Sequence, residues 1–590
     1  MQERIDSRVY EFKGFRLEAA QRRLLYQGQP VPLKPKVLDL LLYLIERRSQ
    51  LVVKEDLMKD VWPDAIVEEN NITVSMSILR KALGDDRDKH EFIETVPRCG
   101  YRFLAEVRDV SHEQSATDGD DQTSQSASKD DPIDSIAVVP AQSESNDPNV
   151  EYLAEGITES IINTLSRIPK LRVLACSTVF RFKGKEIDPE SVGIQLNVKV
   201  VMVLRVMRLG EKLIIRSELV KVSDGSQLWG EQYNRSPSDI LAIQEEIANA
   251  IVQNLKFKLS HQEKIRLTKK PTDNIEAFNL YLRGRYFWNK YDKQWVLKAI
   301  NAFRQAIAID KNYALAYCGM ADAYFRLSNV HFPPCEVLPK AKEAALQAVE
   351  IDEDLAEAHS SLALICVYYD HNWDRAEKEF RKALELNPDL ISAHQRYGSY
   401  LSFMGRFEEA IRHYETALEL DPFSLQSNVN LATAYYLRGD YERAVNHLVN
   451  TSELEPNYMP THFVLACAYI QQGRLAEAIA EFQQIYKLDE EAYLAMGFMG
   501  YAHALAGQRD EAETLLNVLQ DIASRKYVSP YSMLVIHLAL GPEERVFELL
   551  DQLYEERNDW LVWLKVSPEL RSLREHPRFN TLLNRVGFPH

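Results

Sequence analysis

The sequence of 590 residues contains little cysteine and no long apolar run. Its six cysteines lie far apart and form no CxxC pair, which argues against a disulfide framework and against a zinc site. No apolar stretch approaches the roughly 18 residues of a membrane span, and the N-terminus lacks the apolar core of a secretory signal. We therefore expect a cytoplasmic protein with reduced thiols and no membrane contact. A chain of this length should form three or four domains.

Basic side chains are outnumbered by acidic ones, 70 Lys and Arg against 87 Asp and Glu, which gives a net charge of −17 at pH 7. Residues 1–110 nevertheless hold as many basic as acidic side chains, so the acidic excess lies entirely in the remainder. Residues 109–132 consist mostly of Ser, Asp, Gln and Thr, which predicts a disordered acidic linker. Nucleic-acid binding through a local basic face of the first segment is therefore compatible with the acidic total.

The C-terminal half contains an internal repeat with a period of 34 residues. Small residues mark its phase at Gly405, Gly439, Gly473 and Gly507, and again at Ala410, Ala444, Ala478 and Ala512. Each unit has the pattern of a helix, a glycine turn, a second helix and a proline stop. This pattern resembles the tetratricopeptide repeat. We expect about seven repeats over 275–525, followed by further helices and a C-terminal cap over 526–590.

The resemblance to tetratricopeptide repeats also implies a binding groove, because the first helix of each pair lines the concave face in that family. The positions that match this face are Gln395, Ser399, Thr433, Tyr436, Phe463 and Ile470. The cations with which some members of the family hold a carboxylate are missing there. We therefore expect a protein or peptide ligand with a neutral or apolar helix or an extended segment. The alternative is a groove that serves self-association or packs on the middle domain.

The spacing of apolar residues changes twice within the first hundred residues. It alternates as in strands, then follows a helical period, and then alternates again. Apolar–polar alternation at 9–12, 15–18 and 24–27, followed by a turn at Gly28-Gln29-Pro30, predicts a small antiparallel sheet. Helical patterns follow at 36–47, 54–62 and 70–83, and a hairpin is expected from 92–96 and 101–105. A sheet, three helices and a closing hairpin over 1–108 describe a winged helix-turn-helix.

Motifs in the same segment point to a known family. The stretches 33–41, 55–63, 79–85 and 93–103 closely resemble the OmpR/PhoB-type effector domain of bacterial signal transduction. The resemblance implies that the third helix enters the major groove of double-stranded promoter DNA and that the hairpin reaches the minor groove. The family belongs to phosphorelay systems, but we expect no receiver domain here and hence no switch by phosphorylation of a receiver aspartate.

The third helical pattern can be divided into two faces. Ile72, Met76, Leu79 and Leu83 form a stripe at helical spacing and should be buried. The other face is expected to contact DNA, with Val74 and Ile78 on thymine methyl groups. Together with the hairpin arginines, the predicted DNA contacts are Asn70, Asn71, Thr73, Val74, Ser77, Ile78, Arg80, Lys81, Arg98 and Arg102. Alternatively, Val74 and Ile78 contact a protein, and the hairpin arginines are only solvated.

The loop between the second and third helices is where the family touches RNA polymerase. The resemblance therefore implies a polymerase contact at Pro63, Asp64 and Glu68. It also leaves room for a homodimer on DNA.

Residues 133–262 alternate strand and helix patterns, which predicts an α/β domain. The stretches 152–159, 182–185 and 224–233 resemble the TolB amino-terminal-like domain of bacterial regulators. One alternative function of the chain is therefore small-molecule sensing through this domain.

No sequence pattern indicates an enzyme, a cofactor or a metal site. Gly184-Lys185 lacks the other residues of a phosphate-binding loop. The repeat histidines have no paired metal-ligand spacing and are expected to be ordinary helix residues: His394, His413, His447, His462 and His503.

The three parts together resemble HilA/CadC-like regulators. The fold expected is multidomain, with an N-terminal winged helix-turn-helix (α+β), a middle α/β domain and an all-α repeat superhelix. The function expected is that of a one-component, sequence-specific transcription regulator whose repeats bind a modulating protein or peptide. The rival from another class is a scaffold in which the winged helix is a docking module.

Overall fold

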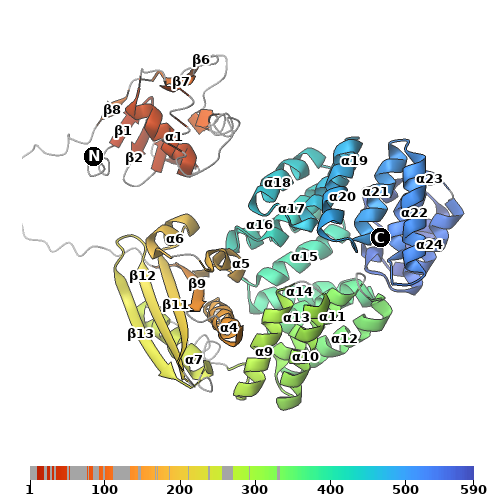
Figure 1. Cartoon of the computed structure of the whole chain (residues 1–590), viewed down its shortest axis with the longest axis horizontal. Coiled ribbons are helices and arrows are strands. Elements are labelled where there is room, and N and C mark those ends of the chain that lie inside the picture. The colour runs from red at the N-terminus through yellow and green to blue at the C-terminus, as the bar shows by residue number, and fades with distance from the viewer. Residues whose placement is uncertain are drawn as a thin grey trace, which may run out of the picture. The chain divides into compact units, whose positions relative to one another are not determined.

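The computed structural model divides the chain into two compact units, residues 1–129 and 130–590 (Figure 1). It describes residues 9–48, 52–53, scattered positions between 57 and 83, 92–109, 133–255 and 270–589, with short gaps inside these ranges. The predicted linker at 109–132 lies almost wholly outside the described residues.

The first unit begins with an antiparallel sheet of five strands in the order β4-β3-β2-β1-β8. The strands are β1 (Val9–Phe12), β2 (Phe15–Glu18), β3 (Arg23–Tyr26), β4 (Gln29–Val31) and β8 (Arg108–Asp109). The predicted turn is wrong at Gln29 and Pro30, which belong to β4 and pair with Tyr26 and Leu25. Pro30 is accommodated because β4 is an edge strand and Pro has no N–H to donate to a further strand.

A second sheet, in the order β5-β7-β6, contains the predicted closing hairpin. Its strands are β5 (Val52–Val53), β6 (Ile93–Val96) and β7 (Gly100–Phe103), and α1 spans Pro35–Glu46. Ile93 pairs with Phe103 in antiparallel register, which confirms the hairpin.

Three of the four residues in the predicted buried stripe of the third helix are confirmed. Met76, Leu79 and Leu83 are buried in the core of the first unit, together with α1 residues such as Leu41. Ile72 lies outside the described residues. The stripe therefore fixes which side of this helix faces the core.

The second unit starts with a mixed five-stranded sheet in the order β10-β9-β11-β12-β13. The strands are β9 (Ser135–Ser143), β10 (Arg172–Val173), β11 (Val200–Leu209), β12 (Lys212–Lys221) and β13 (Gln227–Arg235). β10, β9 and β11 run parallel, and β11, β12 and β13 form an antiparallel meander. β10 ends at Val173, and Cys176 begins the short helix α5 (Cys176–Val179).

Helices α4 (Pro148–Leu165) and α7 (Ile240–Asn254) pack together, and α4 also contacts β9, β11 and the first repeat helix, α9 (Ile275–Trp288). The long helix α4 thus lies between the sheet and the repeats (Figure 1). The Arg285 guanidinium of α9 pairs with the Glu159 carboxylate of α4 at 2.6 Å. On the neighbouring surface, the Asp421 carboxylate accepts hydrogen bonds from Ser177 and Thr178. The sheet region and the repeats therefore share a continuous core.

Antiparallel helix pairs follow one another through the rest of the unit (Figure 1). After α9 they are α10 (Lys293–Ile309), α11 (Ala314–Leu327), α12 (Pro334–Ile351), α13 (Ala356–Ile365), α14 (Trp373–Leu386), α15 (Ile391–Phe403), α16 (Phe407–Leu420), α17 (Leu425–Arg438), α18 (Tyr441–Leu454), α19 (Met459–Gln471), α20 (Leu475–Leu488), α21 (Tyr493–Leu505), α22 (Arg509–Ala523), α23 (Pro530–Leu540) and α24 (Glu543–Glu555). The π-helical turn η3 (Cys366–Asp370) extends α13.

The periodic glycines occupy the turns between paired helices. Gly405, Gly439, Gly473 and Gly507 all have positive φ angles, between 73° and 93°, a backbone region that is costly for residues with a Cβ. One period upstream, His371 takes the same left-handed conformation, with φ at 51°. The repeat thus begins upstream of Gly405, the first glycine that marks it in the sequence.

The chain ends with η4 (Asp559–Trp563), η5 (Pro568–Leu573) and α25 (Pro577–Val586). These elements do more than cover the last helix. The Trp563 ring lies 4.7 Å from that of Phe403 at the end of α15, and the Phe588 ring stacks at 4.8 Å on Trp373 of α14. We call residues 557–589 the return segment, because it runs back along the array to helices about 200 residues earlier in the chain.

Candidate nucleic-acid interface and repeat groove

Two of the predicted DNA-contacting arginines lie among the described residues. Arg80 is half-buried, and its Nη2 donates a hydrogen bond to the Ile93 carbonyl at 3.0 Å. This bond ties the third helix to β6 of the hairpin. Arg102 is half-buried in β7, in register with Glu94 of β6. Arg80 therefore has a positioning role in the protein whether or not it also reaches DNA.

The remaining residues of the predicted interface fall outside the described part of the chain. The predicted DNA contacts among them are Asn70, Asn71, Thr73, Val74, Ser77, Ile78, Lys81 and Arg98. The predicted polymerase contacts Pro63, Asp64 and Glu68 fall outside it as well.

The predicted groove residues divide into two groups. Gln395 Nε2 donates to Ser427 Oγ at 2.8 Å, Ser399 Oγ lies 3.1 Å from the Tyr414 hydroxyl, and Ile470 is buried. The first contact joins neighbouring helix pairs, and the second joins the two helices of one pair. Thr433, Tyr436 and Phe463, in contrast, line a cavity of about 510 Å³.

This C-terminal cavity is lined by α17, α19, the end of α20, α21, the start of α23 with the residues before it, and the return segment. Seven aromatic side chains line it: Tyr436, Phe463, Tyr493, Phe498, Tyr527, Trp560 and Trp563. Trp560 stacks on Tyr531 at 4.4 Å and lies 5.6 Å from Trp563, and Phe463 lies 5.1 Å from Phe498, all between ring centroids. The return segment thus completes a cavity with aromatic walls in the predicted groove.

Two carboxylates of the return segment lie in the same lining. Glu569 is 8% exposed and accepts hydrogen bonds from the Tyr436 and Tyr531 hydroxyls, both at 3.1 Å. Asp559 Oδ1 is buried without a hydrogen-bond partner. Burial raises the pKa of both carboxyls, and that of Asp559 reaches about 7.

Neither carboxylate was expected from the sequence, because the pattern of 526–590 indicates further helices and a C-terminal cap. The local signal is the pair Trp560 and Trp563 directly after Asp559. Large aromatic side chains beside an acid favour a cap and a binding site equally. Only the packing of the return segment against α17 and α21 distinguishes the two.

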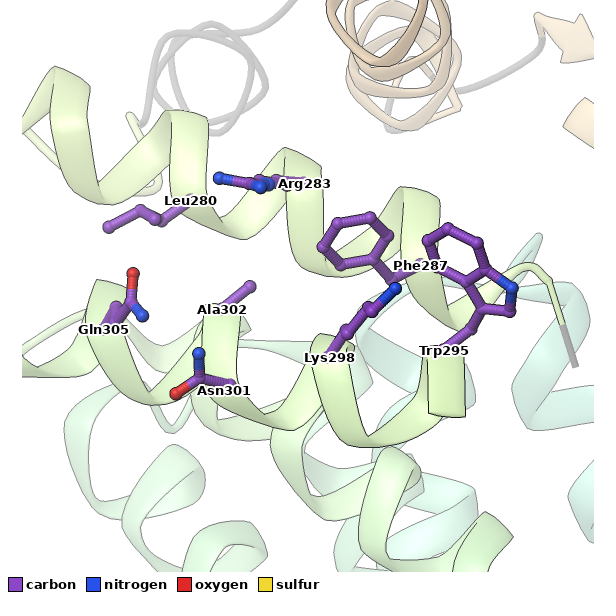
Figure 2. A pocket seen from close by; sticks show the side chains of 8 residues that line it. All are labelled: Leu280, Arg283, Phe287, Trp295, Lys298, Asn301, Ala302 and Gln305. Atoms are coloured by element: carbon purple, nitrogen blue, oxygen red, sulfur yellow. The ribbon is translucent and has the colours of Figure 1, made fainter. Parts of the chain in front are cut away.

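A pocket of about 460 Å³ lies at the opposite end of the array, between α9 and α10. Figure 2 shows the side chains around it: Leu280, Arg283 and Phe287 from α9, and Trp295, Lys298, Asn301, Ala302 and Gln305 from α10. Lys298 Nζ lies 3.9 Å from the Trp295 ring centroid, and the Arg283 guanidinium lies 5.4 Å from that of Phe287. The exposed cations of this N-terminal pocket therefore lie over its aromatic rings.

The repeat histidines form pairs that their spacing did not predict. The pairs are His359–Glu379 at 2.6 Å, His462–Glu481 at 2.6 Å and His394–His413 at 2.9 Å, each measured from a histidine Nδ1 to the nearest partner atom. Burial lowers the pKa of both histidines in the third pair, to about 4 for His413. These two rings are therefore neutral at pH 7, and one Nδ1–H donates to the other Nδ1. All three pairs join the two helices of one repeat.

Within the described residues, no group of three or more His, Cys, Asp or Glu side chains could hold a metal ion. The described part of the chain also contains no helix that is long and apolar enough to cross a membrane. Five cysteines fall in this part, and all have free thiols: Cys176, Cys318, Cys335, Cys366 and Cys467.

Comparison with protein families identifies both ends of the chain. Residues 28–103 match the family described as "Transcriptional regulatory protein, C terminal". Residues 291–328, 354–422 and 469–528 match tetratricopeptide-repeat families. Residues 403–485 match subunit 3 of the anaphase-promoting complex, cyclosome.

Curated relatives cover different parts of the chain. The transcriptional regulator HilA of Salmonella typhimurium (strain LT2) is 25% identical over 395 residues, which cover 66% of each chain. The transcriptional activator CadC of Escherichia coli (strain K12) is 34% identical over 88 residues, 15% of this chain and 17% of CadC. A Rhizobium meliloti (strain 1021) protein named "Putative adenylate cyclase 3" is 31% identical over 234 residues, 39% of this chain and 40% of that protein.

The chain spans less than two thirds of the length of each of these relatives. The family match at 28–103 coincides with the winged-helix unit, and the three repeat matches coincide with the helix pairs. The chain therefore contains an OmpR/PhoB-type winged-helix domain, a mixed-sheet region and a long tetratricopeptide-repeat array, and it is HilA-like over 66% of its length.

Proposed function

We propose that the protein is a cytoplasmic, one-component transcription regulator that binds promoter DNA in a sequence-specific way through its winged helix. The observation that carries the proposal is the buried stripe Met76, Leu79 and Leu83 beside a paired hairpin, inside the segment that matches the regulatory family. A helix with this stripe in the core has its opposite face available for the major groove. The similarity to HilA and CadC supports the same assignment.

The DNA contacts that we propose are those expected from the sequence: Asn70, Asn71, Thr73, Val74, Ser77, Ile78, Arg80, Lys81, Arg98 and Arg102. Val74 and Ile78 would contact thymine methyl groups, so we propose a site that contains T. Arg80 would act in addition by fixing the hairpin relative to the third helix, as its bond to the Ile93 carbonyl supports.

Selection from random duplex DNA tests the proposal, with the full chain and with residues 1–129 in parallel. The expected result is one enriched motif shared by both proteins. Enrichment with the fragment alone would indicate that residues 130–590 inhibit DNA binding. Absence of enrichment with both proteins at low salt would contradict the proposal and favour the scaffold, because phosphate contacts are strongest at low salt.

A matched pair of arginine variants locates the interface. Arg102→Ala should weaken binding to all duplexes and reduce the slope of log K against log salt by about one. Arg16→Ala is the control, because Arg16 of β2 is exposed and pairs with Glu11 and Glu18. Equal losses in the two variants would show that overall charge, rather than the hairpin, governs affinity.

Two further variants test how the sequence is read. Val74→Ala and Ile78→Ala should relax the sequence preference while general DNA affinity is kept. If both variants select the same motif as the wild type, the proposed thymine contacts are wrong.

The proposal includes contact of Pro63, Asp64 and Glu68 with RNA polymerase and a homodimer on DNA. Transcription in vitro from the selected promoter, with Asp64→Ala beside wild type, tests the polymerase contact. A variant that binds DNA normally and activates transcription normally would contradict it.

We further propose that the repeats bind a protein or peptide that modulates activity. The groove positions named above support this proposal, and the aromatic cavity at Tyr436 and Phe463 provides an apolar anchor point. Peptide arrays probed with the full chain and with Phe463→Ala test it. Identical array patterns for the two proteins would contradict peptide binding at this place.

For residues 133–262 we retain the TolB-like assignment as a proposal, supported by the mixed sheet with α4 and α7. We propose no enzyme activity. The cyclase relative aligns with 39% of this chain, so a direct assay of the full chain for adenylate cyclase activity is the test. Detectable turnover would overturn the proposal.

A further inference from the structure

The C-terminal cavity has a chemistry that identifies a class of small molecule. We infer that it binds a small organic amine in its cationic form, with the ammonium group against Asp559 and an apolar body among the aromatic rings. The inference deepens the proposed function, because it names a ligand for part of the repeat groove, but it does not depend on DNA binding.

The charge of the lining favours a cation. Four carboxylates line the cavity: Asp489, Glu491, Asp559 and Glu569. Among the described residues that line it there is no Lys, Arg or His. Lys526 balances Glu491 from outside the lining. An anionic ligand would therefore be repelled, and a cationic ligand attracted.

Asp559 is the carboxylate best placed to receive a ligand. Its Oδ1 is buried without a hydrogen-bond partner, and no described basic side chain forms a salt bridge with it. Asp559 lines the cavity, so an ammonium N–H at the accessible part of its carboxylate would supply the salt bridge that no described side chain provides. Glu569, in contrast, already accepts hydrogen bonds from Tyr436 and Tyr531, so its position is fixed.

The aromatic walls fit the same class of ligand. A volume of about 510 Å³ lies within the usual range for small-molecule pockets. Trp560 directly follows Asp559 in the sequence, and Trp563 comes three residues later. Their ring centroids lie 5.6 Å apart. Aromatic faces attract cations and bury alkyl or aryl groups, so one ligand can use both features. A neutral apolar ligand would bury the Asp559 carboxylate further without pairing it.

Calorimetric titration of the full chain at pH 8 tests the inference with 2-phenylethylamine as the probe. The matched neutral probe is 2-phenylethanol, and the matched anion is 3-phenylpropionate. The amine should bind at least about tenfold more tightly than the alcohol, since a hydrogen bond to a charged group is involved. The anion should not bind. Equal affinity for amine and alcohol, or no heat with the amine at millimolar concentration, would overturn the inference.

Variants place the site. Asp559→Asn keeps the shape of the side chain and should lower amine affinity by about tenfold or more, with no effect on the alcohol. The control Asp510→Asn removes an exposed carboxylate of α22 outside the lining and should leave affinity unchanged. An equal loss in both variants, or no loss in Asp559→Asn, would show that the amine binds elsewhere and would overturn the inference.

The pH dependence gives a second readout. Amine binding requires ionised Asp559, so affinity should fall as the pH falls through about 7, and this dependence should vanish in Asp559→Asn. Tyr368 of η3 and Tyr527 before α23 are the titratable neighbours of Asp559, and burial raises the pKa of both further. Glu569 also has a raised pKa, so Glu569→Gln distinguishes its contribution. A dependence that persists in Asp559→Asn and disappears in Glu569→Gln would move the ammonium partner to Glu569 and overturn the assignment to Asp559.

These titrations are independent of promoter binding. Failure of the DNA selection with normal amine binding would remove the proposed regulator and leave the site. Normal DNA selection without amine binding would contradict the amine site and leave the proposed regulator in place.

Discussion

The two ends of the repeat array carry cavities of similar size and opposite charge. The N-terminal pocket between α9 and α10 has Arg283 and Lys298 over its own aromatic rings, and both cations are exposed. The C-terminal cavity has aromatic rings and carboxylates but no lining cation among the described residues. Both pockets are built on paired repeat helices. In the N-terminal pocket the cations contact aromatic rings of the same pocket, whereas in the C-terminal cavity carboxylates and aromatic rings share the lining.

The return segment accounts for the difference. Both pockets lie on paired helices. Of the two, the C-terminal cavity is the one that the return segment also lines, with Asp559 and Glu569 among its residues. Glu569 and the Oδ1 atom of Asp559 are buried there, whereas Lys298 is exposed to solvent. Burial, more than residue type, therefore sets the energetic importance of each charge.

The largest difference should appear when one tryptophan is removed from each end. Trp560→Ala removes a ring stacked on Tyr531 inside the cavity and should reduce the free energy of unfolding by about 3 kcal/mol. Trp295→Ala should cost only about 1 kcal/mol, because that half-buried ring packs on Phe287 and on the exposed Lys290 and Lys298. Urea unfolding of both variants measures the two values. Equal losses would show that the return segment adds no stability to the C-terminal end.

Glu569 provides the next largest effect. Glu569→Ala leaves the Tyr436 and Tyr531 hydroxyls buried without their acceptor and should cost about 2 kcal/mol. Glu569→Gln is the control, since it keeps one acceptor oxygen and relieves the buried charge. The melting temperature of Glu569→Gln should lie between those of the wild type and Glu569→Ala. A Gln variant less stable than Ala would mean that the negative charge itself stabilises the cavity.

Asp559→Asn should raise stability at pH 8 by about 1 kcal/mol in the absence of ligand. The folded pKa lies above the unfolded value, so the folded protein holds the proton more tightly. The stability that this provides is complete at low pH and is lost as the pH rises through about 7. Asn removes that loss, so the gain in melting temperature should be larger at pH 8 than at pH 5. A gain independent of pH would mean that Asp559 is not the titrating group.

The smallest effect is expected at the N-terminal pocket. Lys298→Ala should change the free energy of unfolding by less than about 0.5 kcal/mol, because the ammonium group is exposed. The same variant should leave 2-phenylethylamine binding unchanged, as measured by calorimetry. A marked loss of amine affinity would show that the amine binds at the N-terminal pocket and not at the C-terminal cavity.

Features that rest on local pattern were predictable. Gly405, Gly439 and their equivalents mark left-handed turns, and the 93–103 motif forms a hairpin, because both depend on neighbours a few residues apart. The turn predicted at 28–30 was wrong at Gln29 and Pro30, since turn composition does not fix where an edge strand begins.

The candidate site in the repeats was predictable only in part. Tyr436 and Phe463 line the cavity as their periodic positions suggest, whereas Gln395 and Ser399 form bonds within the array. Asp559 was missed because its partners in the cavity come from helices up to more than 100 residues away in the sequence. The His394–His413 pair was missed for the same reason, since 19 residues in sequence become 2.9 Å across two helices.

The sequence by itself determined the order of parts, the winged-helix motifs and the 34-residue phase of the repeats, because periodicity and turn chemistry act over short distances along the chain. Only the tertiary structure decided where the return segment lies and which charges it buries. That outcome depends on the fit of Trp560, Trp563 and Phe588 to surfaces formed by distant helices. The cost of burying Asp559 exists only after those surfaces have come together.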